Sequence, residues 1–314
     1  MHAARCVVGF WFFGTSQLAE VRLLRLLAGG DASQARDDSR PRLAAPQHQV
    51  GPDRTAVGVH ARDRARSPVE AGAIRTDVVV TQRLDQAVDP TIERTLRLHR
   101  GVLAELAGNG AALELAVGTG RVALPLAARG VPVSGIELSP AMAEELRAKD
   151  DAQLIEVTIG DMATTRVEGS FRLVYLVFNT IGNLTTQDQQ VACFVNAAAH
   201  LEAGGYFVIE VGVPDLRRLP SGEDARVFSH APGYVGYDRY VDLVAQQAMS
   251  HHFVADGSGV REDRTPFRYV WPSELDLMAR LAGRSLRDRW AGWDHSPFTG
   301  ESTSHVSVWQ KPDY

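Results

Sequence analysis

The stretch Leu113-Glu-Leu-Ala-Val-Gly-Thr-Gly-Arg-Val-Ala123 decides the fold of this chain. It overlaps an apolar run that predicts a buried strand over residues 111–117, and it leads into a predicted helix. Gly118 and Gly120 lie in the turn between them, where glycine lets a ligand approach the backbone amides of a helix N-terminus. The spacing Gly-x-Gly-x-x-Ala also fits the dinucleotide fingerprint, so the turn alone predicts a nucleotide-type ligand without identifying it.

The order of elements on both sides of this turn predicts a parallel sheet. Strands are expected over residues 111–117, 131–137, 154–159, 171–178, 206–211, 285–291 and 305–310. Helices are expected over residues 90–106, 122–129, 140–149, 188–201 and 273–282. Because strands and helices alternate, we expect a parallel sheet in which the helices serve as crossover connections.

The pattern changes after the fifth of these strands. Residues 213–270 contain no long helix pattern, whereas residues 240–245, 252–254 and 267–271 are typical of antiparallel strands. We therefore expect a small antiparallel β insertion between strands five and six.

Residues 1–75 differ in composition from the rest of the chain. They hold eleven arginines, no lysine and seven acidic residues, and residues 29–73 show no sustained helix or strand period. Such a segment buries little apolar surface, so we expect it to be disordered, or to result from a start codon assigned too far upstream. The apolar run Cys6–Gly14 is far shorter than the ~20 residues that a membrane-spanning helix needs.

The overall composition argues against several classes of protein. The 314 residues are 45% hydrophobic and 23% charged, as in soluble globular domains. A net charge of −5 and a pI near 6.1 argue against a nucleic-acid binder. Cys6 and Cys193 make neither a disulfide framework nor a metal site, so we expect a reducing, cytoplasmic setting. No H-E-x-x-H or close set of His, Asp and Glu ligands occurs, and no metal is expected.

A carboxylate follows the glycine turn at the spacing that a ribose requires. Glu137 ends the second predicted strand, nineteen residues after Gly118. A carboxylate there can accept hydrogen bonds from both ribose hydroxyls, a contact that NAD and S-adenosylmethionine sites share. The turn and Glu137 together therefore predict an adenosine-type cofactor of either kind.

Further segments, taken in order along the chain, resemble one family of enzymes. Glu114 stands four positions before the first turn glycine. The run Gly135–Met142 ends a strand in an acidic residue, and Gly160–Met162 forms a short polar turn. Segments 171–180 and 201–210 complete the series. These segments resemble the successive motifs of class I S-adenosylmethionine-dependent methyltransferases of the small-molecule type, over about residues 90–311.

The resemblance implies an α/β, Rossmann-like, doubly wound and mostly parallel sheet of about seven strands, with an antiparallel last strand and S-adenosylmethionine as cofactor. It implies that Asp161 bonds the adenine amino group and that the Met162 amide faces the adenine ring. Ala116 stands where many members have glycine, which affects the geometry near the cofactor carboxylate. The expected cofactor-binding residues are Glu114, Ala116, Gly118, Gly120, Glu137, Met142, Asp161, Met162, Phe178 and Asn179.

We expect methyl transfer to an N or O nucleophile of a small molecule by in-line displacement. Such a transfer needs alignment more than a metal, although an oxygen or a protonated amine still needs a base near its proton. No catalytic residue is identified by a motif. His251 and His252 are candidates that point to opposite faces of one predicted strand, so at most one meets the pocket. Further candidates are His230, Glu210, Tyr234, Tyr237 and Tyr240.

Two alternatives stay open at this stage. An NAD(P)-dependent oxidoreductase would share the glycine turn and Glu137, but would not explain Gly160–Met162. A non-catalytic, methyltransferase-like binding protein would keep the cofactor residues and lack transfer. We expect no nucleic-acid or membrane partner, and we keep a homodimer as a candidate assembly. The expected domain covers residues 76–314, with a cofactor core at 113–212, a substrate-covering insertion at 213–270, and a closing helix and strands at 271–314.

Overall fold

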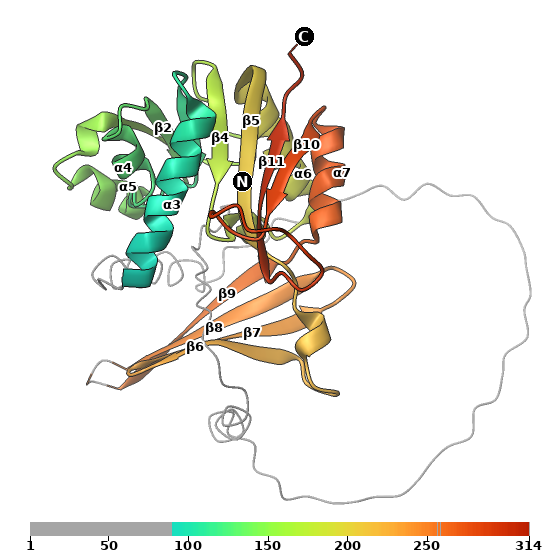
Figure 1. Ribbon diagram of the computed structural model, residues 1–314. Coiled ribbons are helices and arrows are strands. Elements are labelled where there is room, and N and C mark those ends of the chain that lie inside the picture. Colours follow the sequence, from blue (N-terminus) through green and yellow to red (C-terminus); the bar gives the residue numbers. More distant parts are fainter. Residues whose placement is uncertain (1–89, 256, 258, 314) are drawn as a thin grey trace, which may run out of the picture. The chain divides into compact units, whose positions relative to one another are not determined.

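The structure, a computed structural model, describes residues 90–255, 257 and 259–313. All of them belong to one compact unit, which contains two sheets (Figure 1). The expectations for residues 1–75 lie outside the described residues. Among the helices that the structure describes, none combines the length and the apolarity that crossing a membrane requires.

The larger sheet has seven strands in the order β10-β11-β5-β4-β1-β2-β3. Its strands are β1 (Ala112–Leu115), β2 (Val133–Glu137), β3 (Ile155–Ile159), β4 (Phe171–Leu176), β5 (Leu201–Gly212), β10 (Ser285–Trp290) and β11 (Ser304–Gln310). Every pairing is parallel except those of β11, which runs antiparallel to both of its neighbours. The predicted Rossmann-like sheet with an antiparallel last strand is therefore confirmed.

Helices cover both faces of this sheet. They are α3 (Pro90–Ala107), α4 (Ala123–Ala127), α5 (Pro140–Arg147), α6 (Gln187–His200) and α7 (Pro272–Leu281). Residues of α6 and α7 join one buried apolar cluster, and residues of α3, α4 and α5 join the other. The sheet is therefore buried on both sides, which is why its central strands are almost continuously apolar.

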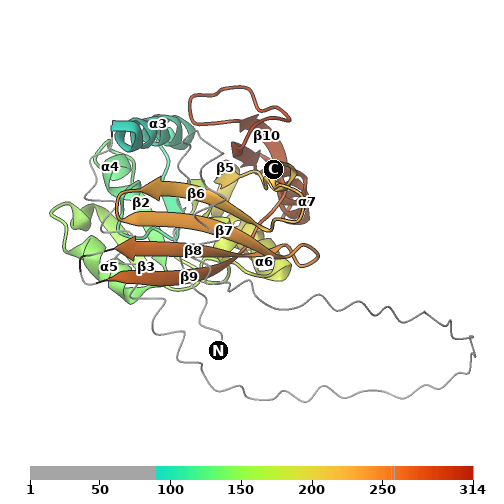
Figure 2. The ribbon, with the colours of Figure 1, turned by 90° about the horizontal axis from the view of Figure 1, so that it is seen from below.

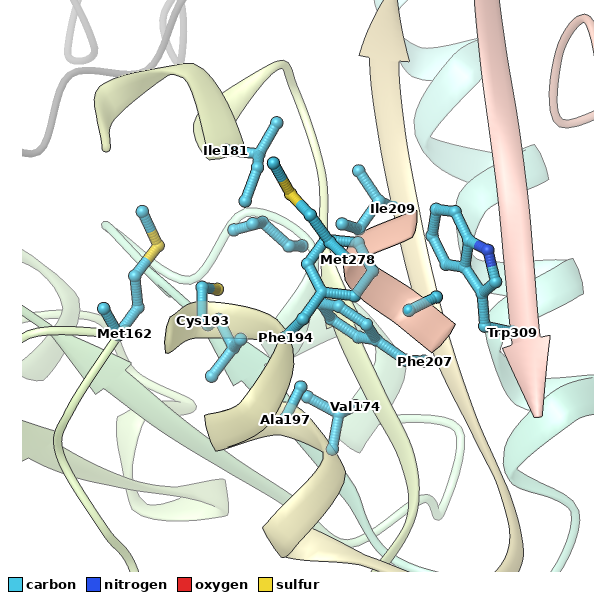
Figure 3. Close-up of a cluster of buried hydrophobic side chains, with 14 of the residues drawn as sticks. Met162, Val174, Ile181, Cys193, Phe194, Ala197, Phe207, Ile209, Met278 and Trp309 are labelled. Atoms are coloured by element: carbon cyan, nitrogen blue, oxygen red, sulfur yellow. The ribbon is translucent and has the colours of Figure 1, made fainter. Parts of the chain in front are cut away.

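The α6–α7 face is held by close aromatic packing. Phe194 of α6 packs edge-on against Phe207 of β5 and Trp309 of β11, with ring centroids 5.0 and 5.3 Å apart. Figure 3 shows these rings together with Cys193 and Met278 in the same apolar cluster. This packing makes the sheet and helices a rigid base for the segments at the strand ends.

The second sheet is antiparallel, with strand order β6-β7-β8-β9. Its strands are β6 (Ala225–Ala231), β7 (Tyr234–Asp242), β8 (Gln247–Ala255) and β9 (Val260–Arg268). The small sheet lies below the larger one in Figure 1, and its four strands are seen side by side in Figure 2. The predicted β insertion between strands five and six is confirmed.

The strand bounds differ from the expectation throughout the small sheet, where β7 and β8 are longer than expected, and at the start of β5. The sequence predicted no strand at β6, and it placed only the last residues of β9 in a strand. Both strands interrupt their apolar residues with polar ones, β9 with arginines and acidic residues and β6 with Arg226, Ser229 and His230, so their alternation is weak. Leu201 begins β5 instead of ending α6, because the chain turns directly from the helix into the sheet.

Candidate active site

The glycine turn lies at the carboxyl end of β1, at the edge where ligands of such sheets bind. Gly118 and Gly120 both adopt the left-handed backbone region, with φ angles of 59° and 78°. A Cβ at Gly120 would stand 3.0 Å from side-chain carbons of Leu124 and Leu146, so this position requires glycine for space as well as for conformation. Ala116 also has a positive φ of 57°, a conformation that favours glycine.

Glu137 ends β2 directly beside this turn. Its carboxylate accepts hydrogen bonds from the backbone N–H groups of Gly118 and Ser139, both at 2.8 Å. Burial raises the pKa of Glu137, and backbone hydrogen bonds from Ser139, Gly118 and Leu138 oppose that rise. A carboxylate can accept about four hydrogen bonds, so Glu137 keeps some acceptor capacity for a ligand hydroxyl.

Glu114 lies in β1, shortly before the turn. Its Oε2 accepts a hydrogen bond of 3.0 Å from the hydroxyl of Tyr175 on β4. Burial raises the pKa of Glu114 to about 8, although the Tyr175 bond and the positive charge of Arg121 act against the rise. Arg121 follows the turn, and its guanidinium lies 4.6 Å from the ring centroid of Phe178. A carboxyl and a guanidinium therefore face the same small volume.

These groups line a first cavity of about 350 Å³. We call it the turn cavity. Its lining residues are Glu114, Ala116, Val117, Gly118, Thr119, Arg121, Val122, Met142, Val177, Phe178 and Thr180. Five of the ten residues predicted to bind the cofactor are among them. Gly120 and Glu137 stand just behind the lining, where they shape the turn. The sequence analysis missed Arg121, although its place directly after Gly120 could have indicated it.

Asp161 and Met162 lie in the turn after β3 and do not line the turn cavity. Asp161 Oδ1 accepts a hydrogen bond of 2.8 Å from the Ala163 N–H, and the side chain of Met162 packs in the apolar cluster beside α6. The turn is nevertheless tied to the end of β2, because the N–H of Gly160 donates to the backbone carbonyl of Glu137 at 2.8 Å. Their predicted adenine contacts stay predictions.

The segment after β4 is held in an unusual backbone conformation. Phe178 and Asn179 have φ angles of 57° and 61°, although neither is glycine. The Phe178 N–H donates to Glu210 Oε2 at 3.0 Å, and the Asn179 Oδ1 accepts from the Gly212 N–H. Such strain persists only where the surrounding structure holds it, and it is common at ligand-binding sites.

Glu210, a candidate base in the sequence analysis, instead bonds the Phe178 N–H and His99. Its Oε2 lies 3.0 Å from Nε2 of the fully buried His99 on α3. Burial alone would raise the pKa of Glu210, but the charge of His99 and the hydrogen bonds from His99 and Phe178 lower it. Glu210 therefore fixes the strained segment and does not line either cavity.

A second, larger cavity of about 730 Å³ lies between this strained segment and the small sheet. We call it the sheet cavity. The core contributes Asn179, Gly182, Asn183 and the end of β5, while the small sheet contributes Phe228, Asp238, Tyr240, Ser250, His252, Thr265, Phe267 and Arg268. Asn179, a predicted cofactor residue, thus faces this cavity. Residues of η2 (Thr180–Asn183) and the preceding loop line both cavities.

The two neighbouring histidines do lie on opposite faces of β8. His252 lines the sheet cavity, and burial lowers its pKa to about 4. His251 stacks on Tyr237 at 4.5 Å between ring centroids, and its Nδ1 lies 2.8 Å from Glu262. Tyr240 also lines the cavity, whereas His230 is exposed near the end of β6. The structure thus brings His252 and Tyr240 to the cavity and leaves His251, Tyr237 and His230 outside it.

In the part of the chain that the structure describes, no three His, Cys, Asp or Glu side chains come together as a metal site. The polar side chains that line the two cavities carry carboxyl, hydroxyl, amide, imidazole and guanidinium groups. Both cavities lie at the carboxyl edge of the larger sheet, where ligands of Rossmann-like folds bind.

Comparisons with known proteins identify the family. The methyltransferase domain family matches residues 112–205. The structure of the CcbJ methyltransferase from Streptomyces caelestis is 36% identical, covers 69% of this chain and 89% of that chain, and superposes with a TM-score of 0.64. The chain belongs to the S-adenosylmethionine-dependent methyltransferases, so it is an enzyme and S-adenosylmethionine is its cofactor. Both alternatives, an oxidoreductase and a non-catalytic binding protein, are therefore wrong.

More distant structures share the fold alone. A methyltransferase from Clostridium acetobutylicum ATCC 824 is 15% identical, with a TM-score of 0.59 over 76% of this chain and 98% of that chain. The sugar N-methyltransferase KedS8 from Streptoalloteichus sp ATCC 53650 is 20% identical, with a TM-score of 0.55 over 83% of this chain and all of that chain. Among curated protein sequences, no match was found.

Proposed function

We propose that this enzyme transfers the methyl group of S-adenosylmethionine to a nitrogen or oxygen nucleophile of a small molecule held in the sheet cavity. The observation that carries the proposal is the segment Val177–Gly182, which lines both cavities. Phe178 and Thr180 face the turn cavity, whereas Asn179 and Gly182 face the sheet cavity. A cofactor in the first and an acceptor in the second would therefore meet across one short segment.

The residues of the turn cavity match the chemistry of the cofactor. The amino-acid end of S-adenosylmethionine carries an ammonium and a carboxylate, and the cavity offers the buried carboxyl of Glu114 and the guanidinium of Arg121. Glu137, just behind the lining, keeps acceptor capacity that suits a ribose hydroxyl, and Met142 supplies an apolar wall. Gly118 and Gly120 keep the backbone close enough for these contacts, and Asp161 with Met162 stays our assignment for the adenine end.

The bound cofactor supplies a methyl group that its sulfonium already activates. The protein therefore has to align the nucleophile with the methyl–sulfur bond and exclude water, and such alignment can lower the barrier by about 7–11 kcal/mol. The strained segment at Phe178 and Asn179 is fixed by Glu210, Gly212 and, through Glu210, by His99. This fixed segment sets the angle at which an acceptor in the sheet cavity would approach.

The lining of the sheet cavity is of the kind that small-molecule ligands contact, mostly apolar with a few polar groups. Phe228, Tyr240, Phe267 and Tyr269 give it apolar walls, with a few polar groups between them. We propose that residues 213–270 act as the acceptor-covering part of a domain spanning residues 76–314, with the homodimer as its candidate assembly.

Calorimetric titration with S-adenosylmethionine, S-adenosylhomocysteine and NADH tests the cofactor part of this proposal. We expect the two sulfur ligands to bind and NADH not to bind. Transfer of labelled methyl groups to a panel of small amines and alcohols tests the acceptor part. Labelling of protein or nucleic acid, with none of the small molecules, would contradict it.

A further inference from the structure

Asp238 is the buried carboxyl of the sheet cavity. It lies on β7, and 3% of its surface is exposed. Asp238 and Tyr240, two residues apart on this strand, both line the cavity. In the sheet register it stands beside Arg226 of β6 and Ser250 of β8. A buried carboxylate is costly unless a cation or several hydrogen-bond donors compensate it.

The protein alone supplies little of that compensation. The Ser250 hydroxyl hydrogen-bonds Asp238, and Arg226 acts on it only through its charge. The guanidinium of Arg226 forms its ion pair with Asp215 instead. Arg268 also lines the cavity, but its guanidinium is engaged by Glu274, Gln190 and Gln246. Within the described residues, Asp238 forms no ion pair of its own.

A chain of hydrogen bonds ends at Asp238. Tyr234 Oη lies 2.7 Å from His252 Nδ1, and His252 Nε2 lies 3.1 Å from Ser250 Oγ. An ionised Asp238 can only accept, so the Ser250 hydroxyl donates to it and accepts from His252 Nε2–H. His252 is then neutral and accepts at Nδ1 from the Tyr234 hydroxyl, in keeping with its lowered pKa. Each group in this hydrogen-bond series donates in the direction of Asp238. The series therefore orients the Asp238 carboxylate, and the remaining lone pairs of that carboxylate are available to a ligand.

The walls around Asp238 are aromatic. Phe228, Tyr240 and Phe267 line the same cavity. Aromatic faces attract a cation, and a carboxylate forms charge-assisted hydrogen bonds with it. The combination suits an ammonium group on a small apolar or aromatic body. A neutral alcohol would leave the buried carboxylate without a countercharge.

We propose that Asp238 is a catalytic residue that binds the ammonium group of a primary or secondary amine acceptor and takes one of its protons. The proton moves from nitrogen to the Asp238 carboxylate, and the freed nitrogen lone pair forms the new N–C bond. The methyl–sulfur bond breaks, and its electron pair stays on sulfur, giving S-adenosylhomocysteine and a methylated ammonium. This inference rests on the proposed function and narrows its acceptor to an amine.

The protonation of Asp238 supports this role. Burial raises the pKa of Asp238 to about 7, against the Ser250 hydrogen bond and the charge of Arg226. A carboxyl with such a pKa can accept a proton near neutral pH and release it again. Below pH 7 it is largely protonated, so an arriving ammonium would displace a proton. Arg226 contributes its positive charge next to Asp238. Burial lowers the pKa of His252 to about 4 and raises that of Tyr240 to about 12 and that of Tyr234 further, so these three groups stay neutral in this range.

The test uses benzylamine as the probe and benzyl alcohol as its neutral match, with the full chain saturated by S-adenosylhomocysteine. Calorimetry at about pH 8 is expected to show benzylamine binding at least roughly tenfold more tightly than benzyl alcohol, because only the amine offers a countercharge. Asp238→Asn should remove this preference and leave S-adenosylhomocysteine affinity unchanged. Asp224→Asn, the same change at an exposed ion pair with Arg239, is the control and should keep the preference.

A second readout follows proton release. At about pH 6, titrations in two buffers of different ionisation enthalpy should show about one proton released per benzylamine bound, and none for Asp238→Asn. If Asp238→Asn does not fold, Ser250→Ala replaces it. The Ser250 hydrogen bond lowers the pKa of Asp238, so its loss should raise that pKa. Benzylamine binding should then strengthen only at a higher pH than in the wild type.

Equal binding of amine and alcohol, or a preference that Asp238→Asn retains, would overturn the role of Asp238 and leave the proposed function standing. If benzylamine binds through Asp238 but no small molecule ever receives a methyl group, the proposed function fails instead. An unchanged pH dependence in Ser250→Ala would also count against the inference.

Discussion

Replacing Asp238 by asparagine should make the protein more stable at neutral and alkaline pH, and this gain should disappear in acid. The folded-state pKa of Asp238 is about 7, raised by burial from the ordinary value of 3.8. Between these two values the folded protein holds a proton that the unfolded chain has lost. The free energy of unfolding of the wild type therefore falls as the pH rises through this window, and Asp238→Asn lacks this fall.

The difference of about three pKa units sets the magnitude. At about 1.4 kcal/mol per unit, ionised Asp238 costs the fold at most roughly 4 kcal/mol above pH 7, and close to nothing at about pH 4. Urea unfolding, followed by tryptophan fluorescence between about pH 4.5 and 8, gives the free energy of unfolding of both proteins.

The curves of the two proteins should converge in acid and separate towards pH 8, with the variant above the wild type. Parallel curves over the whole range would refute the reasoning, because Asp238 would then not change its protonation on folding. Asp224→Asn should run parallel to the wild type, since its side chain is 53% exposed. The predicted gain in stability on replacing Asp238 is the kind of cost that proteins accept at functional sites.

Three further changes test other parts of the site. Glu137→Ala should weaken S-adenosylmethionine binding at least roughly tenfold, because charge-assisted bonds to the ribose are lost; an unchanged calorimetric affinity would count against the ribose assignment. Arg121→Ala should weaken binding of S-adenosylhomocysteine but not of 5′-methylthioadenosine, which lacks the amino-acid end; equal losses would place Arg121 elsewhere. His99→Ala should lower the free energy of unfolding by about 3 kcal/mol or more, since the buried Glu210 loses its partner. In the same urea assay, His230→Ala at an exposed position should have little effect, and similar losses for both would contradict the structural role of His99.

Local patterns were enough to predict several of the residues that line the turn cavity. The glycine spacing, the acidic residue Glu114 before it and Glu137 at the end of the next strand all lie within about one βαβ unit. In such a unit the geometry is fixed by the chain itself, because parallel strands put their carboxyl ends at one edge. The alternation of strands and helices predicted the layers for the same reason.

The lining of the sheet cavity could be predicted only in part. The opposite orientation of His251 and His252 follows from the two-residue period of a strand, and the structure confirms it. Which of them faces the cavity depends on the register of β8 and on the side of the small sheet that packs below the core. A single sequence contains no local sign of either.

The sequence by itself determined the Rossmann-like order of elements and the glycine turn with its carboxylates, because these depend on residues close together in the chain. Only the tertiary structure singled out Asp238 from the 38 acidic residues and placed Arg121 beside Phe178. Burial and cavity walls arise where β5, η2 and the small sheet meet, and those segments are distant in sequence. The electrostatic cost of a buried charge depends on that packing and not on the residue's neighbours along the chain.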